Sequence, residues 1–143
     1  MATIFVDIDG TVADLEHRKH MLTIDRDYDS FYKSCTFDTP IKDMVKIVTD
    51  LSGIYRIVFV TGRPECIRQL TRNWLGYVFP KPISESELIM RKDGDKRKDS
   101  VVKLELAMSC AVKPLFILED RDRVVSAWRS GGYRVFQVCD GNY

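Results

Sequence analysis

The chain has 143 residues, of which 45% are hydrophobic and 30% are charged, and its formal net charge is +1. These values indicate one soluble globular domain with its own core, and they exclude a disordered or strongly basic chain. Any contact with nucleic acid must therefore come from a local basic patch. No C-x-x-C pair occurs among the cysteines (Cys35, Cys66, Cys110 and Cys139), which argues against a zinc site.

No apolar run is long enough to cross a membrane. Acids also interrupt the first ten residues, where a secretory signal peptide needs an unbroken apolar stretch. We therefore expect a cytoplasmic protein with reduced thiols and no membrane partner.

Five apolar, β-rich runs alternate with helical patterns along the chain. Strands are expected at 3–8, 55–61, 87–90, 114–119 and 133–139, and helices at 41–51, 64–75, 100–110 and 121–130. Two consecutive glycines, at 131–132, end the last helix. This alternation predicts an α/β fold with a five-stranded, doubly wound parallel sheet. Ligands of such sheets bind beyond the carboxyl ends of the strands, near the point where the strand order reverses.

Polar residues follow three of the predicted strands. They are Asp7 and Asp9 after the first strand, Thr61, Gly62 and Arg63 after the second, and Glu119 and Asp120 after the fourth. A segment with six basic and three acidic residues, 91–103, leads into the third helix. Because the carboxyl ends of parallel strands meet at one edge of a sheet, these groups are expected to converge there.

The string D-x-D-G-T at 7–11 requires an explanation, because a buried strand seldom ends on two acids. A calcium loop with Gly10 as its glycine would put Phe5 at a ligand position, and a plain Asp-Gly turn leaves Asp7 unexplained. In the functional interpretation, Asp7 attacks phosphorus as a carboxylate nucleophile. Asp9 then protonates the leaving oxygen and later deprotonates the hydrolytic water.

A carboxylate approaches a phosphate only if the charge between them is masked, and Mg²⁺ suits this task. We expect Asp7, the backbone carbonyl of Asp9 and Asp120 to bind it. The hydroxyl of Thr61 and the amide of Gly62 are placed to hold a phosphoryl oxygen. A strand-end threonine by itself is more often bonded to its own turn, so it counts here as one part of the cluster.

Four stretches resemble, in order and in position, the four motifs of the haloacid dehalogenase (HAD) superfamily of phosphotransferases: IFVDIDGTVAD, FVTGR, RKDSVVK and ILEDRD. Within that superfamily the chain is most similar to the 3′-phosphatase domain of phage-type polynucleotide kinase/phosphatase. That closer likeness lies in LTRNW, GDKRKDSVVK and EDRDRVVSAWRSGGYRVFQVCDGNY. It spans residues 4–143 and is weakest between 25 and 46. The resemblance implies a HAD-like Rossmannoid three-layer fold.

The resemblance also implies a role for each matching residue. Asp7 is the nucleophile, Asp9 the acid and base, and Lys103, rather than Lys98, the motif lysine, with Asp99 as a supporting acid one helical turn before it. Asp7 and Asp120 are implied as magnesium ligands. Glu119 stands where a second aspartate is common and is counted with them. Arg18 and Arg72 are implied to hold the phosphate end of the substrate.

Any cap over the site must be small, because only about fifty residues separate Asp9 from Thr61. We expect it within residues 15–40, here called the cap segment. A small cap leaves the site open, which suits a polynucleotide end as well as a nucleotide. No G-x-x-x-x-G-K-[ST] string is present. Residues 1–143 are therefore expected to form a single phosphatase domain that stands alone or works beside a separate polynucleotide kinase or ligase.

The function that these features predict is Mg²⁺-dependent hydrolysis of a 3′-phosphate on DNA, RNA or a nucleotide, through an aspartyl-phosphate. A 5′-nucleotidase acting on deoxynucleoside monophosphates uses the same motifs, so the motifs leave both open. Two non-enzymatic interpretations are weaker. A phospho-acceptor receiver domain normally lacks an acid such as Asp9, and a binder of nucleic-acid ends has no need of Asp7.

Overall fold

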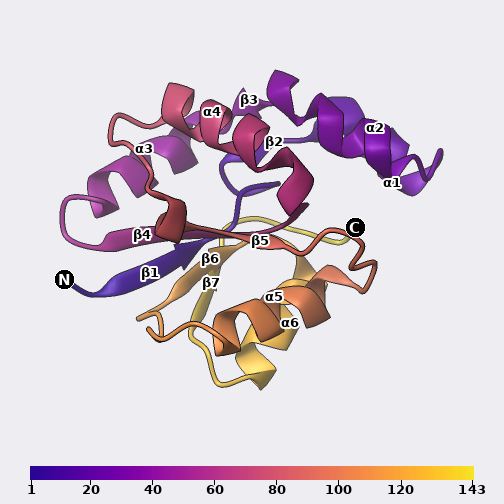
Figure 1. Ribbon diagram of the computed structural model, residues 1–143. Helices are drawn as coiled ribbons and strands as arrows, with labels where there is room; N and C mark the ends of the chain where they lie inside the picture. The colour runs from indigo at the N-terminus through magenta and orange to yellow at the C-terminus, as the bar shows by residue number, and fades with distance from the viewer.

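A computed structural model describes all residues, 1–143, and contains a central sheet of five parallel strands. The strands are β1 (Thr3–Val6), β4 (Arg56–Pro64), β5 (Leu88–Arg91), β6 (Ile117–Glu119) and β7 (Val135–Gln137). They pair in the order β5-β4-β1-β6-β7 (Figure 1). The chain passes outward from β1 to β5 and then crosses to β6 on the other side of β1. The predicted fold class is confirmed, and the strand order reverses between β1 and β6.

Four longer helices cover the two faces of the sheet (Figure 1). On one face lie α3 (Lys42–Leu51) and α4 (Arg68–Val78), and on the other α5 (Asp99–Met108) and α6 (Asp122–Ser130). Two 3₁₀ turns, η3 (Glu65–Ile67) and η4 (Glu85–Glu87), precede α4 and β5. The predicted helices are all present, although 64–75 opens as the end of β4 and η3 before α4 begins. No helix combines the length and the apolar character needed to cross a bilayer.

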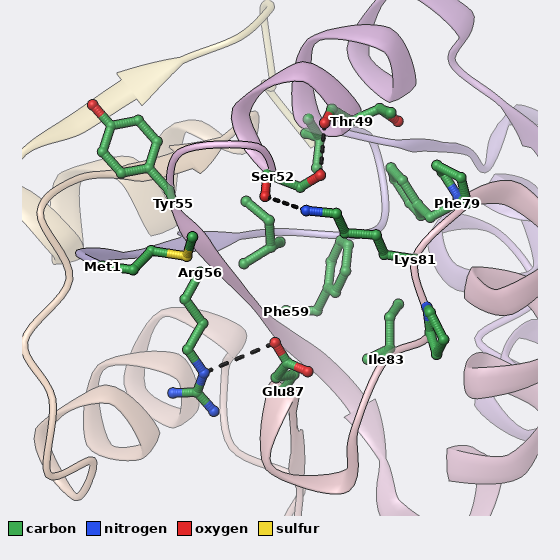
Figure 2. A pocket seen from close by; sticks show the side chains of 14 residues that line it. Met1, Thr49, Ser52, Tyr55, Arg56, Phe59, Phe79, Lys81, Ile83 and Glu87 are labelled. Atoms are coloured by element: carbon green, nitrogen blue, oxygen red, sulfur yellow. Dashed lines mark hydrogen bonds and ion pairs between the residues drawn. The ribbon is translucent and has the colours of Figure 1, made fainter.

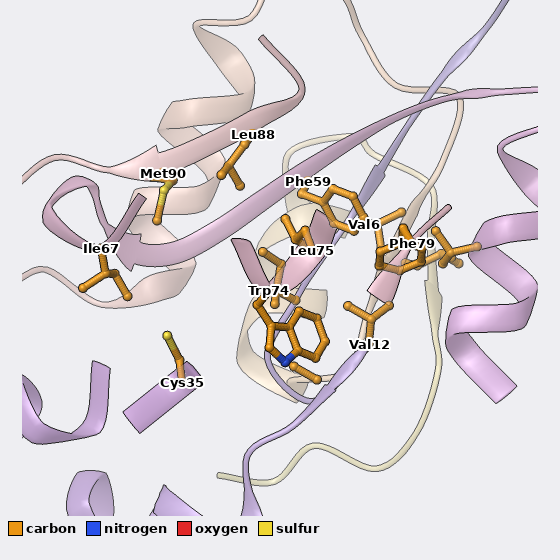
Figure 3. Packing of buried hydrophobic residues seen from close by; sticks show 14 of the residues in the cluster. Val6, Val12, Cys35, Phe59, Ile67, Trp74, Leu75, Phe79, Leu88 and Met90 are labelled. Atoms are coloured by element: carbon orange, nitrogen blue, oxygen red, sulfur yellow. The ribbon is translucent and has the colours of Figure 1, made fainter. Parts of the chain in front are cut away.

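The core has two halves, one on each face of the sheet. Ile4 and Val6 of β1 belong to the half that contains Trp74 of α4, part of which is drawn in Figure 3. Phe5, between them in sequence, belongs to the half that contains Trp128 of α6. Successive side chains of a strand point to opposite faces. Because both faces are covered, β1 reads as an unbroken apolar run, and its acids come only beyond its end.

Short elements lie between β1 and α3. The first is β2 (Ala13–Asp14), and the cap segment after it contains η1 (Glu16–Arg18), α1 (Lys19–Thr23), α2 (Tyr28–Lys33), η2 (Ser34–Phe37) and β3 (Thr39–Pro40). β2 and β3 pair antiparallel. α2 is capped at its N-terminus by Asp27, which accepts the amide N–H of Ser30 at 3.1 Å. The sequence analysis placed a cap here but none of these helices, since elements this short show no periodicity.

Candidate active site

A cavity of about 890 Å³ opens at the carboxyl edge of the sheet. Acids that follow β1 and β6 line it, together with the end of β4, the basic segment before α5 and the cap segment. This is the edge where the reversal of strand order places ligands in doubly wound sheets. The volume also lies within the range of ordinary ligand sites, about 300–1,000 Å³.

Asp7 and Lys103 form a buried ion pair in this cavity. The Lys103 Nζ donates to Asp7 Oδ1 at 2.5 Å and to Glu119 Oε2 at 2.9 Å. The hydroxyl of Thr11 donates to the other oxygen of Asp7 at 2.9 Å. β1, α5 and β6 supply these groups, so three distant stretches of sequence meet at one carboxylate. The sequence analysis expected Asp7, Glu119 and Lys103 at one edge, and the structure brings them together.

The carboxyl groups here are crowded and poorly solvated. Burial and the charge of Glu119 raise the pKa of Asp7 to about 7, although Lys103 acts against them. Burial and the charge of Asp7 raise the pKa of Asp120 to about 7. Burial also raises the pKa of Glu119. Three carboxyl groups face one lysine, so the cluster favours an additional positive charge.

The same three carboxyl groups fit a hard divalent cation. Asp7, Glu119 and Asp120 each offer an oxygen within 4.8 Å of the others. Asp120 Oδ1 is buried and has no hydrogen-bond partner, which is costly unless a ligand uses it. Oxygen donors of this charge are those that Mg²⁺ prefers. Gly10 (φ +85°) makes room, since a Cβ there would lie 2.1 Å from Asp120 Oδ2.

The side chain of Asp9 lies in a different network. Its Oδ1 accepts from Arg18 Nη2 and from Arg63 Nη2, both at 2.6 Å, and its Oδ2 accepts from Arg63 Nε at 3.1 Å. Burial favours the neutral acid, but the two guanidinium groups outweigh it and hold the pKa of Asp9 well below its usual range. Only the backbone carbonyl of Asp9 is directed toward Asp120, through a shared contact with the Tyr143 hydroxyl.

Asp38 completes this network and was missed by the sequence analysis. Its Oδ2 accepts from Arg18 Nη2 at 2.7 Å and from Arg63 Nη2 at 3.1 Å, and its Oδ1 accepts from Arg18 Nε at 2.8 Å. The side chains of Arg18, Arg63 and Asp38 are fully buried. Two arginines and two aspartates thus form a largely buried group with balanced charges that ties the cap segment to the end of β4, and the ring of His17 also contacts Asp38 Oδ1, at 2.7 Å.

Arg63 received no role from the sequence, although FVTGR places it directly at a strand end. In the structure both arginine side chains are fully buried, and Arg63 is among the residues that line the cavity whereas Arg18 is not. The available signal was the position of Arg63 beside Thr61 and Gly62.

Thr61, Gly62 and Asp99 lie at the end of β4 and the start of α5. The Thr61 hydroxyl oxygen is buried and accepts the amide N–H of Arg63 at 3.1 Å, so it braces the turn. Gly62 lines the cavity, and a Cβ there would lie 2.5 Å from Asp99 Oδ1. Asp99 is bonded to Arg91 and, at 3.2 Å, to Arg121. Gly62 therefore permits the close packing of Asp99 on the end of β4.

Arg72 is not brought to the cavity, and its expected place at the site is corrected here. Its guanidinium donates to Glu85 Oε1 at 2.5 Å and to the Ile83 carbonyl at 2.9 Å, on the outer side of α4. The preceding residue, Thr71, is buried against the site's network and accepts from Arg63 Nη1 at 3.2 Å. Consecutive helical residues point about 100° apart, so Arg72 is directed away from the Arg63 network that Thr71 contacts.

A second hollow lies at the amino edge of the sheet (Figure 2). There Lys81 Nζ donates to the Ser52 carbonyl at 2.6 Å, and Arg56 faces Glu87 at 3.8 Å. Phe59, Phe79 and other apolar side chains form much of its wall. The hollow contains no group of acids comparable with the carboxyl edge, so it adds nothing to the reactive cluster.

Comparison with known proteins agrees with this geometry. The family described as the polynucleotide kinase PNKP phosphatase domain matches residues 1–143. A polynucleotide kinase/RNA ligase of Autographa californica nuclear polyhedrosis virus is 30% identical over 142 residues, which cover 95% of this chain and 19% of that protein. The chain thus spans about a fifth of that relative.

Solved structures show the same fold. A chain of a Pnkp1/Rnl/Hen1 complex is 26% identical, with a TM-score of 0.76 over 99% of this chain and 47% of that chain. The class C acid phosphatase of Bacillus anthracis is 16% identical, with a TM-score of 0.62 over 99% of this chain and 67% of that chain, a likeness of fold. The chain therefore belongs to the family of polynucleotide kinase PNKP phosphatase domains, and with them to the HAD-type phosphatases, which are phosphoric monoester hydrolases.

Proposed function

We propose that this domain is a Mg²⁺-dependent phosphomonoesterase that acts through an aspartyl-phosphate on Asp7 and removes 3′-phosphates from polynucleotide ends or nucleotides. One observation carries the proposal. The buried carboxylate of Asp7, which lines the cavity, accepts from the ammonium of Lys103 and offers an oxygen within 4.8 Å of oxygens on Glu119 and Asp120. That arrangement supports a nucleophile held against a cation-binding cluster.

In the first step the carboxylate of Asp7 attacks phosphorus and the ester oxygen leaves. Lys103 favours the ionised form of Asp7 and offsets negative charge that gathers during transfer. When bound, Mg²⁺ neutralises the charge between carboxylate and phosphate. Asp7, Asp120 and the backbone carbonyl of Asp9 would hold it, and Glu119, which also donates an oxygen to the cluster, positions Lys103.

Asp9 is the group proposed to protonate the leaving oxygen and to deprotonate the attacking water. In the structure Arg18 and Arg63 hold it as a carboxylate. For Asp9 to donate a proton, one of the arginines must therefore release its hydrogen bonds to Asp9 and form them with the anionic oxygens of the substrate instead. Of the two arginines, Arg63 is the one among the residues that line the cavity. Its two bonds to Asp9 would then pass to the phosphate, which leaves Asp9 free to carry a proton.

The cavity walls support a nucleic-acid end as substrate. Lys96, Arg97 and Lys98, from the segment before α5, line the cavity, as does Arg123 at the start of α6. These cations face the phosphates of a strand whose terminal phosphate reaches Asp7. Residues of the cap segment, which we propose acts as a cap, also line the cavity. A separate polynucleotide kinase or ligase that acts on the same end is the proposed partner.

A panel of phosphorylated substrates tests this function. With Mg²⁺, we expect a 3′-phosphorylated oligonucleotide to be hydrolysed with a kcat/KM at least about tenfold above that of its 5′-phosphorylated isomer and of both mononucleotides. Released phosphate is measured for DNA and RNA versions, with chelator as the control. A preference for 5′-mononucleotides identifies a 5′-nucleotidase instead, and activity that survives exhaustive chelation rules out the metal.

Stability should depend on pH and Mg²⁺ together. The pKa values of about 7 for Asp7 and Asp120 exceed the ordinary 3.8, so between these values the folded protein binds more protons than the unfolded chain. Without metal, the contribution of these two groups to stability is present below about pH 4 and is lost as the pH rises to about 7. Mg²⁺ binds the ionised carboxylates of the folded protein.

We therefore expect Mg²⁺ to raise the Tm by several degrees more at pH 8 than at pH 5, since about 1 kcal/mol corresponds to roughly 2–8 °C in domains of this size. Thermal unfolding followed by circular dichroism measures the shift. NaCl at equal ionic strength is the control. Equal shifts at the two pH values, or a shift that salt reproduces, would contradict the assignment of this cluster to the cation.

A further inference from the structure

The hydroxyl of Tyr143 reaches into the acidic cluster. It donates to Asp120 Oδ2 at 2.7 Å and lies 3.4 Å from the backbone carbonyl oxygen of Asp9. These are two of the three groups proposed to hold the cation. Tyr143 also lines the active cavity, although none of the mechanistic steps above uses it.

Backbone contacts of the last residues position Tyr143 beside the acidic cluster. The Arg121 Nε donates to the Tyr143 carbonyl at 2.5 Å, and the Asp122 amide donates to the Gly141 carbonyl at 2.9 Å. A Cβ on Gly141 would lie 2.0 Å from the Asp120 carbonyl oxygen, so only glycine allows the two backbone segments to pack this closely. Residues 141–143 are thus packed directly against the backbone that carries Asp120.

Two further features fix the ring and the hydroxyl. The ring lies between two cations, with Lys19 Nζ 4.3 Å and the Arg121 guanidinium carbon 4.8 Å from its centroid. Gly10 leaves space for the hydroxyl, since a Cβ there would lie 2.6 Å from it. Lys19 belongs to the cap segment, so Tyr143 contacts the cap and the acidic cluster at once.

The two carboxylate oxygens of Asp120 differ in their hydrogen bonding. Oδ2 is occupied by the Tyr143 hydroxyl, while Oδ1 is buried and has no partner. A carboxylate that binds a metal through one oxygen commonly has its other oxygen held by a hydrogen-bond donor, which fixes its orientation. The phenol has one O–H, and donating it to Oδ2 leaves Oδ1 free for a cation.

We propose that Tyr143 is a positioning residue for the cation site, which holds Asp120 by Oδ2 so that Oδ1 faces the metal. The inference rests on the proposed Mg²⁺ dependence and assigns no chemical step to the phenol. It also makes metal affinity sensitive to the cap segment, because the Lys19 ammonium lies over the same ring.

Mg²⁺ titration of the substrate-free protein by calorimetry tests the proposal without catalysis. Tyr143→Phe keeps the ring and its cation contacts but removes the hydroxyl, and we expect the Kd for Mg²⁺ to rise about 10–100-fold. Lys19→Ala removes one cation from the ring, and we expect a rise of about 2–5-fold. Tyr133→Phe is the matched control, since the Tyr133 hydroxyl makes no hydrogen bond and its ring packs on Trp128; it should leave the Kd unchanged.

If Tyr143 only stabilised the fold, its replacement would not change Mg²⁺ affinity selectively. For Tyr143→Phe we expect the Mg²⁺ concentration for half-maximal activity to rise, while KM at saturating Mg²⁺ stays within about twofold of the parent value. An unchanged Kd would overturn the proposal, and a lower Kd would show that the phenol competes with the cation. If Tyr143→Phe unfolds, the Lys19→Ala result decides by the same measurement. Failure of the parent protein to bind Mg²⁺ counts against the proposed function instead.

Discussion

Replacing Asp7 with asparagine is expected to lower kcat on a 3′-phosphorylated oligonucleotide on the order of 10⁴-fold or more, because an amide cannot form the covalent phosphoenzyme. Asp7 is the carboxylate bonded to Lys103 at 2.5 Å, and Lys103 has no role of its own in bond formation. Steady-state phosphate release at saturating Mg²⁺ measures the loss. Trapping of labelled phosphate on the parent protein after an acid quench, but not on the variant, checks the intermediate directly.

The same substitution should leave the fold intact. Asparagine is nearly isosteric, Lys103 keeps its bond to Glu119 at 2.9 Å, and removing one charge lessens the repulsion that raises the pKa values of this cluster. We expect a Tm equal to or above that of the parent in the absence of Mg²⁺. Asp43→Asn, an exposed site on α3, is the control and should alter neither property. Turnover near the parental rate in Asp7→Asn would remove Asp7 from the role of nucleophile.

Sequence reasoning located the acidic cluster because parallel sheets obey a simple rule. Asp7 and Asp120 follow buried strands that read clearly as apolar runs, and the carboxyl ends of such strands share one edge. Lys103 was assigned through a motif on a helix, and α5 does bring it to Asp7. These positions depend on local pattern and on strand order, which short apolar runs predict well.

The parts that were missed depend on tertiary contacts between segments with weak patterns. Asp38 and Arg63 are 25 residues apart, and nothing in either local sequence shows that they meet. The short cap helices lack periodicity for the same reason. Arg72 shows a different limit. Its helix was predicted, but which side chain of that helix points toward the site is decided by the rotation of α4, which turns Thr71 toward Arg63 and Arg72 toward Glu85.

The largest expected effect on stability belongs to Asp38→Asn, at about 3–5 kcal/mol of the free energy of unfolding. Asp38 shares two buried guanidinium groups with Asp9, and the four side chains are together neutral. The amide removes one negative charge but little volume, so Arg18 and Arg63 are left with a single carboxylate between them. Uncompensated buried charge is among the few causes of losses this large. Urea denaturation followed by circular dichroism measures the loss.

Two further variants test whether the loss of stability comes from the uncompensated buried charge. Asp50→Asn breaks an exposed pair with Lys46 and should cost less than about 1 kcal/mol. Arg18→Met added to Asp38→Asn removes the excess cation, and we expect it to recover part of the loss, since coupled residues are not additive. A loss below about 1 kcal/mol for Asp38→Asn alone would mean that Asp9 or water compensates both arginines. The cap segment would then be held to the sheet by its apolar contacts, such as Cys35 in the core half that contains Trp74, rather than by this charge network.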